Sequence, residues 1–219
     1  MTAFGSGSTG AIRPVAPRNP VVLSHPPLQK LQIASIDGLQ GGLRLPIPVA
    51  SVTAIGYHAS GDGALALAPV GRQANQGVFT RVANKLFGDG ESGLPYYLLG
   101  GADGPGTSAL DVGAAKMTDV YSPVDGIVVG LAKYILNGHQ FGSRIEIQPA
   151  GAPSIVIILS QLWKDPALTV GSAVEAGSSK VGRVADLSGV EKQALARYTQ
   201  DAGNHVTIQA FAAATQTLR

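Results

Sequence analysis

The sequence contains no cysteine and few aromatic or charged residues. The absence of cysteine excludes disulfides, thiolate chemistry and cysteine-based zinc sites, but exported bacterial proteins also do without cysteine, so the compartment stays open. No stretch is apolar for long enough to span a bilayer. Residues 1–10 have neither the basic nor the apolar region of a signal peptide. If the protein is exported, we expect its signal or anchor to lie outside this sequence.

Neither sign of charge is in large excess, because the formal net charge is only +2. The basic residues are scattered singly, without a run and without interleaved aromatic residues that would make a phosphate-binding stripe. The sequence therefore argues against a nucleic acid as partner.

Glycine and proline are abundant, with 29 and 14 residues in a chain of 219. A chain of this length can bury a real core, and this composition favours short strands joined by tight turns over a helical bundle. We predict a mainly all-β fold, a β-sandwich or barrel with one or two short helices.

Composition divides the chain into three parts. Residues 1–45 are a Pro/Gly-rich extended N-terminal arm, residues 46–95 a small annex with a hairpin and a short helix, and residues 96–219 a β domain. The first 27 residues cannot offset their ordering entropy with a core of their own, so something else has to hold them. Self-assembly through this arm is one way to do so.

The annex has local signals of its own. Residues 51–57 and 64–67 flank a Gly61-Asp62-Gly63 turn, which predicts a hairpin. Apolar residues at helical spacing predict a helix over residues 76–86.

Beyond residue 96, apolar runs alternate with turn signals at even spacing, which is typical of a compact sandwich or barrel. The predicted strands are residues 119–121, 126–134, 143–148, 155–159, 181–185 and 205–210. Ser188 and Glu191 have the spacing of a capping box, so we predict one helix over residues 190–199.

Several of these segments resemble, in order, the catalytic domain of lysostaphin-type zinc endopeptidases. They are residues 110–115, 119–128, 142–147, 170–177, 181–182 and 203–208. The resemblance covers roughly residues 96–210, about half of the chain, and implies a duplicated-hybrid-motif-like β-sandwich or barrel. It also implies a role in the bacterial cell envelope, outside the cytoplasm, because that family cuts peptidoglycan cross-bridges.

The resemblance further implies where a zinc site would stand. The family's aspartate ligand matches Asp111, but the histidine four residues before it matches Thr107. In the terminal His-x-His, the assisting histidine matches His205 and the zinc ligand matches Thr207. Gln161 stands where another catalytic histidine is expected.

Threonine and glutamine are weak zinc ligands, and a hydrolytic site needs three good protein ligands and an open position for water. We therefore expect no bound metal, no cofactor and no catalysis, with Asp111 as a turn or capping carboxylate and His205 as a hydrogen-bonded strand histidine. The alternative is a zinc endopeptidase with atypical ligands, in which His58 or His139 completes the site.

A different alternative is a carrier domain. Lys116, nine residues before Asp125, resembles the modified lysine at the hairpin tip of biotinyl and lipoyl carriers. The residue before it is Ala115 where these carriers have methionine, and a solvated loop lysine is the simpler reading.

Together these observations predict a non-catalytic, lysostaphin-like domain that binds peptidoglycan or a cell-envelope protein. A structural subunit of an assembly is the remaining alternative.

Overall fold

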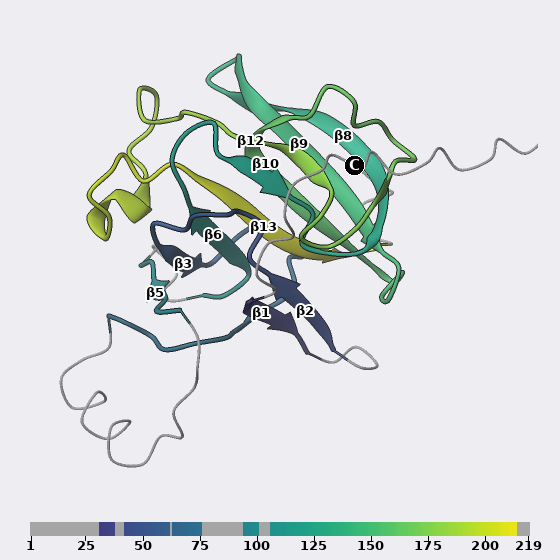
Figure 1. The fold of residues 1–219 in the computed structure, drawn as a ribbon. Coiled ribbons are helices and arrows are strands. Elements are labelled where there is room, and N and C mark those ends of the chain that lie inside the picture. The colour runs from purple at the N-terminus through teal and green to yellow at the C-terminus, as the bar shows by residue number, and fades with distance from the viewer. Residues whose placement is uncertain (1–30, 38–41, 62, 76–93, 101–105, 214–219) are drawn as a thin grey trace, which may run out of the picture.

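The computed structural model describes residues 31–37, 42–61, 63–75, 94–100 and 106–213. Within these ranges the chain is almost entirely β-structure, which confirms the mainly β fold predicted from composition (Figure 1). The strands are β1 (Gln32–Ile36), β2 (Leu43–Pro46), β3 (Ile55–His58), β4 (Ala68–Pro69), β5 (Tyr97–Leu98), β6 (Ala109–Gly113), β7 (Asp119–Tyr121), β8 (Gly126–Leu136), β9 (His139–Pro149), β10 (Ile155–Lys164), β11 (Ala173–Val174), β12 (Lys180–Val184) and β13 (His205–Ala212).

The strands form two sheets. The small sheet has the order β2-β1-β4, and the large one runs β11-β8-β9-β10-β13-β6-β3-β5, with β12 joining β10 to β7. The path from β11 to β5 is open, so the large sheet does not close into a barrel. The fold is therefore the sandwich rather than the barrel of the two predicted forms.

Alternation of side chains along β9 and β13 determines which of their residues enter the core. In β13, Val206, Ile208 and Ala210 are fully buried, and the residues between them point to the other face of the sheet. The same pattern places Ile145 and Ile147 of β9 in the core. One face of the large sheet thus carries the core, and the opposite face is called the outer face below.

The small sheet closes the core side of the large one. Ile33 and Leu45 are buried in the same hydrophobic cluster as Leu110 and Ile208. Tyr57 of β3 is fully buried and donates its hydroxyl hydrogen bond to the carbonyl of Ile33 in β1. Strands from the segments predicted as arm and annex therefore take part in the same core as the C-terminal strands.

The predicted hairpin between residues 51–57 and 64–67 is wrong. Strand β3 pairs antiparallel with β6 and parallel with β5, while Ala64 bridges to Phe211 of β13. Pairing with these distant strands lets Tyr57 and Ile55 enter the main core, which a two-stranded hairpin alone could not provide.

The strands predicted beyond residue 96 all form, but the predicted helix over residues 190–199 does not. Only a 3₁₀ helix, Ala194–Arg197, forms there. The Ser188 hydroxyl donates to Asp186 at 2.6 Å instead of capping a helix. The helix predicted over residues 76–86 lies outside the described residues. Across the described ranges, no helix has the length and apolar character needed to cross a bilayer.

Candidate functional site

A row of four residues crosses the outer face of the large sheet. Ser160 of β10 lies opposite Thr207 of β13, Thr207 opposite Asp111 of β6, and Asp111 opposite Gly56 of β3. Directly opposed residues of antiparallel strands share one face of the sheet. The side chains of Ser160, Thr207 and Asp111 therefore form a continuous line that ends at Gly56. We call it the polar row.

Asp111 is the centre of this row. Its carboxylate is 5% exposed and accepts a 2.8 Å hydrogen bond at Oδ1 from the hydroxyl of Thr207. Nε2 of His58 lies 3.4 Å from each carboxylate oxygen, and Nε2 of His205 lies 3.5 Å from Oδ1. One buried carboxylate is thus contacted by a hydroxyl and two imidazoles.

Each of these imidazoles is oriented by its other nitrogen. Nδ1 of His58 donates to the carbonyl of Ala59 at 2.7 Å, and Nδ1 of His205 donates to the carbonyl of Gly203 at 2.8 Å. Both Nε2 atoms are thereby turned toward Asp111. His205 therefore has the hydrogen bond predicted for it, whereas the prediction of Asp111 as a turn or capping carboxylate is wrong, because it lies inside β6.

The electrostatics of the cluster favour the charged carboxylate. Burial by itself would raise the pKa of Asp111, but attraction to His205 and hydrogen bonds from His58 and Thr207 outweigh it, so the pKa lies below its ordinary value. The hydrogen bond to Asp111 raises the pKa of His58, and burial only partly opposes this. Contacts within the chain therefore favour the ionised form of Asp111.

Gln161 lies beside the polar row in an unusual backbone conformation. Its φ is 63°, and the pairing register of β10 with β9 shifts between Leu159 and Leu162. Its side chain hydrogen-bonds Tyr134 of β8, whereas its Oε1 is buried and has no hydrogen-bond partner among the described residues. Gln161 therefore offers an acceptor that the described part of the chain leaves unused.

The zinc site implied by the sequence resemblance does not fit these residues. Thr207 uses its hydroxyl on Asp111, and Thr107 lies away from the row, lining a groove with Ile36 and Leu67. His58 and His205 approach Asp111 from opposite directions, since they pair with Ala109 and Gly113, two residues to either side of it. Within the described ranges, no three histidine, aspartate or glutamate side chains are arranged to hold one metal ion.

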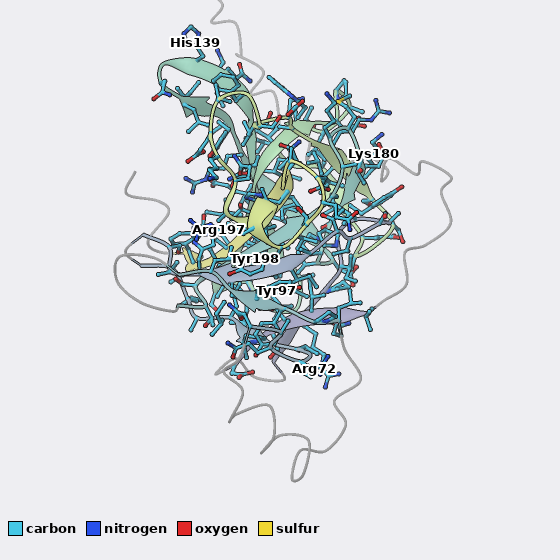
Figure 2. The ribbon with its side chains drawn as sticks, turned by 90° about the vertical axis from the view of Figure 1, so that its left-hand side faces the viewer. Arg72, Tyr97, His139, Lys180, Arg197 and Tyr198 are labelled. Carbon is cyan, nitrogen blue, oxygen red and sulfur yellow. The ribbon has the colours of Figure 1, made fainter. Side chains whose placement is uncertain are left out.

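Sequence analysis did not single out His58, which contacts Asp111, or Tyr134, which contacts Gln161, as site residues of the predicted domain. His58 was considered only as a ligand of the alternative enzyme, and its place at the end of a predicted strand gave no partner. Tyr134 carried no signal at all. His139, the other candidate, lies at the turn between β8 and β9, at the far end of that hairpin (Figure 2).

Lys116 does not occupy the tip of a hairpin. Strand β6 before it pairs with β3 and β13, and β7 after it pairs with β12. Its ammonium group forms a 3.0 Å ion pair with Asp186. The geometry of a carrier lysine is therefore contradicted, because that geometry needs two mutually paired strands around the lysine.

Comparisons with known proteins give few matches. No family model matches the chain, and no curated protein matches it. Among solved structures, the chain is similar in part to the NMR solution structure of lysostaphin, with a TM-score of 0.38 and 17% sequence identity. The match covers 52% of this chain and 39% of lysostaphin, so the chain spans about two fifths of that protein's length.

Proposed function

We propose that this chain is a non-catalytic domain of the bacterial cell envelope that binds a peptide-like ligand over the polar row, with the peptides of peptidoglycan as that ligand. The observation that carries the proposal is the 2.8 Å hydrogen bond from Thr207 to Asp111. By the sequence resemblance, Thr207 stands where a zinc-binding imidazole is expected. Its hydroxyl instead satisfies the carboxylate that would be the remaining ligand.

Two further features support binding rather than hydrolysis. Asp111, His205 and Thr207 are all under 10% exposed although they lie on the outer face of the sheet. Buried polar groups with defined orientation are typical of recognition sites, because they bind only ligands that replace the hydrogen bonds of water. A water activated for hydrolysis would need a metal or a free base, and both imidazoles are already held on Asp111.

The proposal is tested with the purified chain and purified bacterial sacculi. We expect the chain to sediment with the sacculi, to leave their turbidity unchanged with and without added zinc, and to bind no zinc in calorimetric titration. Loss of sedimentation in a Ser160→Leu variant, with Ser154→Leu as an exposed control, would place binding at the polar row. A chain that fails to sediment with sacculi, but is retained by an envelope protein, would replace peptidoglycan by a protein ligand.

One observation favours a second function, the zinc endopeptidase with atypical ligands. His58 presents Nε2 to both oxygens of Asp111 with its Nδ1 held by a carbonyl, an arrangement also found in metal-binding histidines. Binding of one zinc per chain that is lost in both His58→Ala and His205→Ala, together with zinc-dependent clearing of sacculi, would establish this function and overturn the first.

A further inference from the structure

The segment between β12 and β13 is a loop whose two ends are tied together. The backbone N–H of Leu187 donates to Oδ1 of Asn204 at 3.0 Å, and Nδ2 of Asn204 donates to Asp186 at 3.3 Å. Lys116 holds Asp186 in place from the neighbouring turn. We call residues 188–203 the insert; its base is fixed, so any movement of the insert has to hinge there.

The insert packs against one end of the polar row, at Gly56. Leu195 is fully buried against Gly56, the residue opposite Asp111, because a Cβ built on Gly56 would lie 2.8 Å from Leu195 Cδ2. Burial and, after it, the negative charge of Glu191 in the insert raise the pKa of Tyr134 in β8, the tyrosine that is bonded to Gln161. Viewed from this side, the insert lies in front of the strands (Figure 2).

Few contacts hold the insert down. Leu195 belongs to a small hydrophobic cluster with Ala54 and Leu99 that is separate from the main core. Tyr198 stacks on Tyr97 with ring centroids 4.2 Å apart, and the two lie together in Figure 2. Residues of the insert also line a hollow of about 350 Å³. Segments with few buried contacts are those that open locally while the rest of a fold stays intact.

Gln161 gives a reason for the insert to open. Among the residues that the structure describes, its buried Oε1 has no donor, and its backbone is held at φ 63°. A buried acceptor without a donor is unfavourable, and strained backbone is often found where a protein binds a ligand. A ligand that donates an N–H group would remove this deficit.

We infer that the insert is a lid hinged at Asp186 and Asn204, which closes the polar row, and that the ligand admitted beneath it donates an amide N–H hydrogen bond to Oε1 of Gln161. The identity of the ligand rests on the proposed function, whereas the movement of the lid does not. It names the amide N–H groups of a peptide as the recognised chemistry.

Movement of the lid is tested without any ligand. The chain has no native cysteine, so a Tyr97→Cys/Tyr198→Cys variant can be joined by a short bis-maleimide across the stacked pair. Carbethoxylation of His205, which is 4% exposed, is followed by mass spectrometry with exposed His139 as internal reference. A Tyr97→Ser/Tyr198→Ser variant given the same reagent is the control.

We expect His205 to react about tenfold more slowly in the joined protein than in the serine control, and Leu195→Ala to react about tenfold faster than the wild type. Thermal unfolding confirms that each variant is folded. Equal reaction of His205 in the joined and control proteins would overturn the lid.

Recognition by Gln161 is tested by sedimentation with sacculi. We expect Gln161→Leu to weaken binding by about threefold to tenfold, while Gln140→Leu, at an exposed position of the hairpin, leaves it unchanged. If the wild type binds sacculi and Gln161→Leu binds equally well, the role of Gln161 is wrong and the proposed function stands. If the wild type does not bind sacculi, the proposed ligand is wrong, and the labelling of His205 still decides the lid.

Discussion

Thr207 of β13 donates a 2.8 Å hydrogen bond to Asp111 of the paired strand β6. From the sequence resemblance one would instead expect a zinc ion held between these two positions. A hydroxyl contributes one hydrogen bond and no charge. Besides this hydroxyl, the carboxylate of Asp111 is approached by Nε2 of His58 at 3.4 Å and by Nε2 of His205 at 3.5 Å.

The first prediction concerns this hydrogen bond. Thr207→Val removes the donor and leaves a buried carboxylate short of one partner, so we expect the free energy of unfolding to fall by about 1 to 2 kcal/mol. Thr207→Ser keeps the hydroxyl, so we expect a smaller decrease in the free energy of unfolding for this variant. Urea unfolding of both variants measures the difference, and equal stability of the valine and serine variants would show that the hydroxyl contributes nothing.

The second prediction concerns the contact between Gly56 and the insert. In Gly56→Ala the new methyl group would meet Leu99 at 2.7 Å and Leu195 at 2.8 Å, so one of these side chains has to move. We expect a loss of about 1 to 3 kcal/mol in unfolding free energy. Gly151→Ala is the matched control, because nothing lies within 4 Å of its added carbon. A Gly56→Ala variant as stable as the control would contradict the packing of Leu195.

The third prediction concerns the joint between the two sheets. Burial raises the pKa of Tyr57, which favours the protonated hydroxyl that donates to the carbonyl of Ile33. Tyr57→Phe removes one of two donors to this carbonyl, because the backbone N–H of Val70 also donates to it at 3.0 Å. We expect the variant to lower the unfolding free energy by about 0.5 to 1.5 kcal/mol. Faster hydrogen exchange in β1 should accompany the loss, and exchange that is unchanged in β1 would argue against a joint at this point.

The fourth prediction concerns acid sensitivity. Burial would raise the pKa of Asp119, but hydrogen bonds and charges from Lys180 and Arg183 lower it below its ordinary value. A carboxyl group with a depressed folded-state pKa stabilises the fold above its unfolded pKa, and this contribution disappears as the pH falls through the folded one. We expect Asp119→Asn to cost about 1 to 3 kcal/mol at neutral pH, because Lys180 is almost buried and loses its partner.

Urea unfolding at neutral and acidic pH checks this prediction. The difference between wild type and Asp119→Asn should shrink as the pH falls below about 4. Asp37→Asn, at an exposed position after β1, is the control. A difference that stays constant with pH would mean that the ion pairs of Asp119 do not contribute to stability.

The predicted strands beyond residue 96 are confirmed because their signal is local. Alternation in segments such as residues 143–148 specifies both the strand and the face that is buried. The hairpin and the helix were wrong because each signal competed with a distant partner. Strand β3 gains more burial beside β6 than in a two-stranded hairpin, and Ser188 bonds the exposed carboxylate of Asp186 rather than a helix N-terminus.

The candidate site could be predicted only in part. Alternation along β13 and β6 predicts that Thr207 and Asp111 each lie on the face of their own strand that points away from the core. The resemblance placed His205 beside them. Nothing in the sequence pairs His58 with Asp111, because the two are 53 residues apart and meet only through the register of β3 on β6. Tyr134 contacts Gln161 in the same way, because β8, β9 and β10 are neighbouring strands of one sheet.

The sequence by itself determined the β class and which residues of long strands such as β9 and β13 face the core, because composition and two-residue periodicity are properties of neighbouring residues. Only the tertiary structure decided which strands pair, that His58 joins Asp111, and that Leu195 of the insert packs against Gly56. These contacts join segments far apart in the chain, and their register follows from burying the whole core at once rather than from any local pattern.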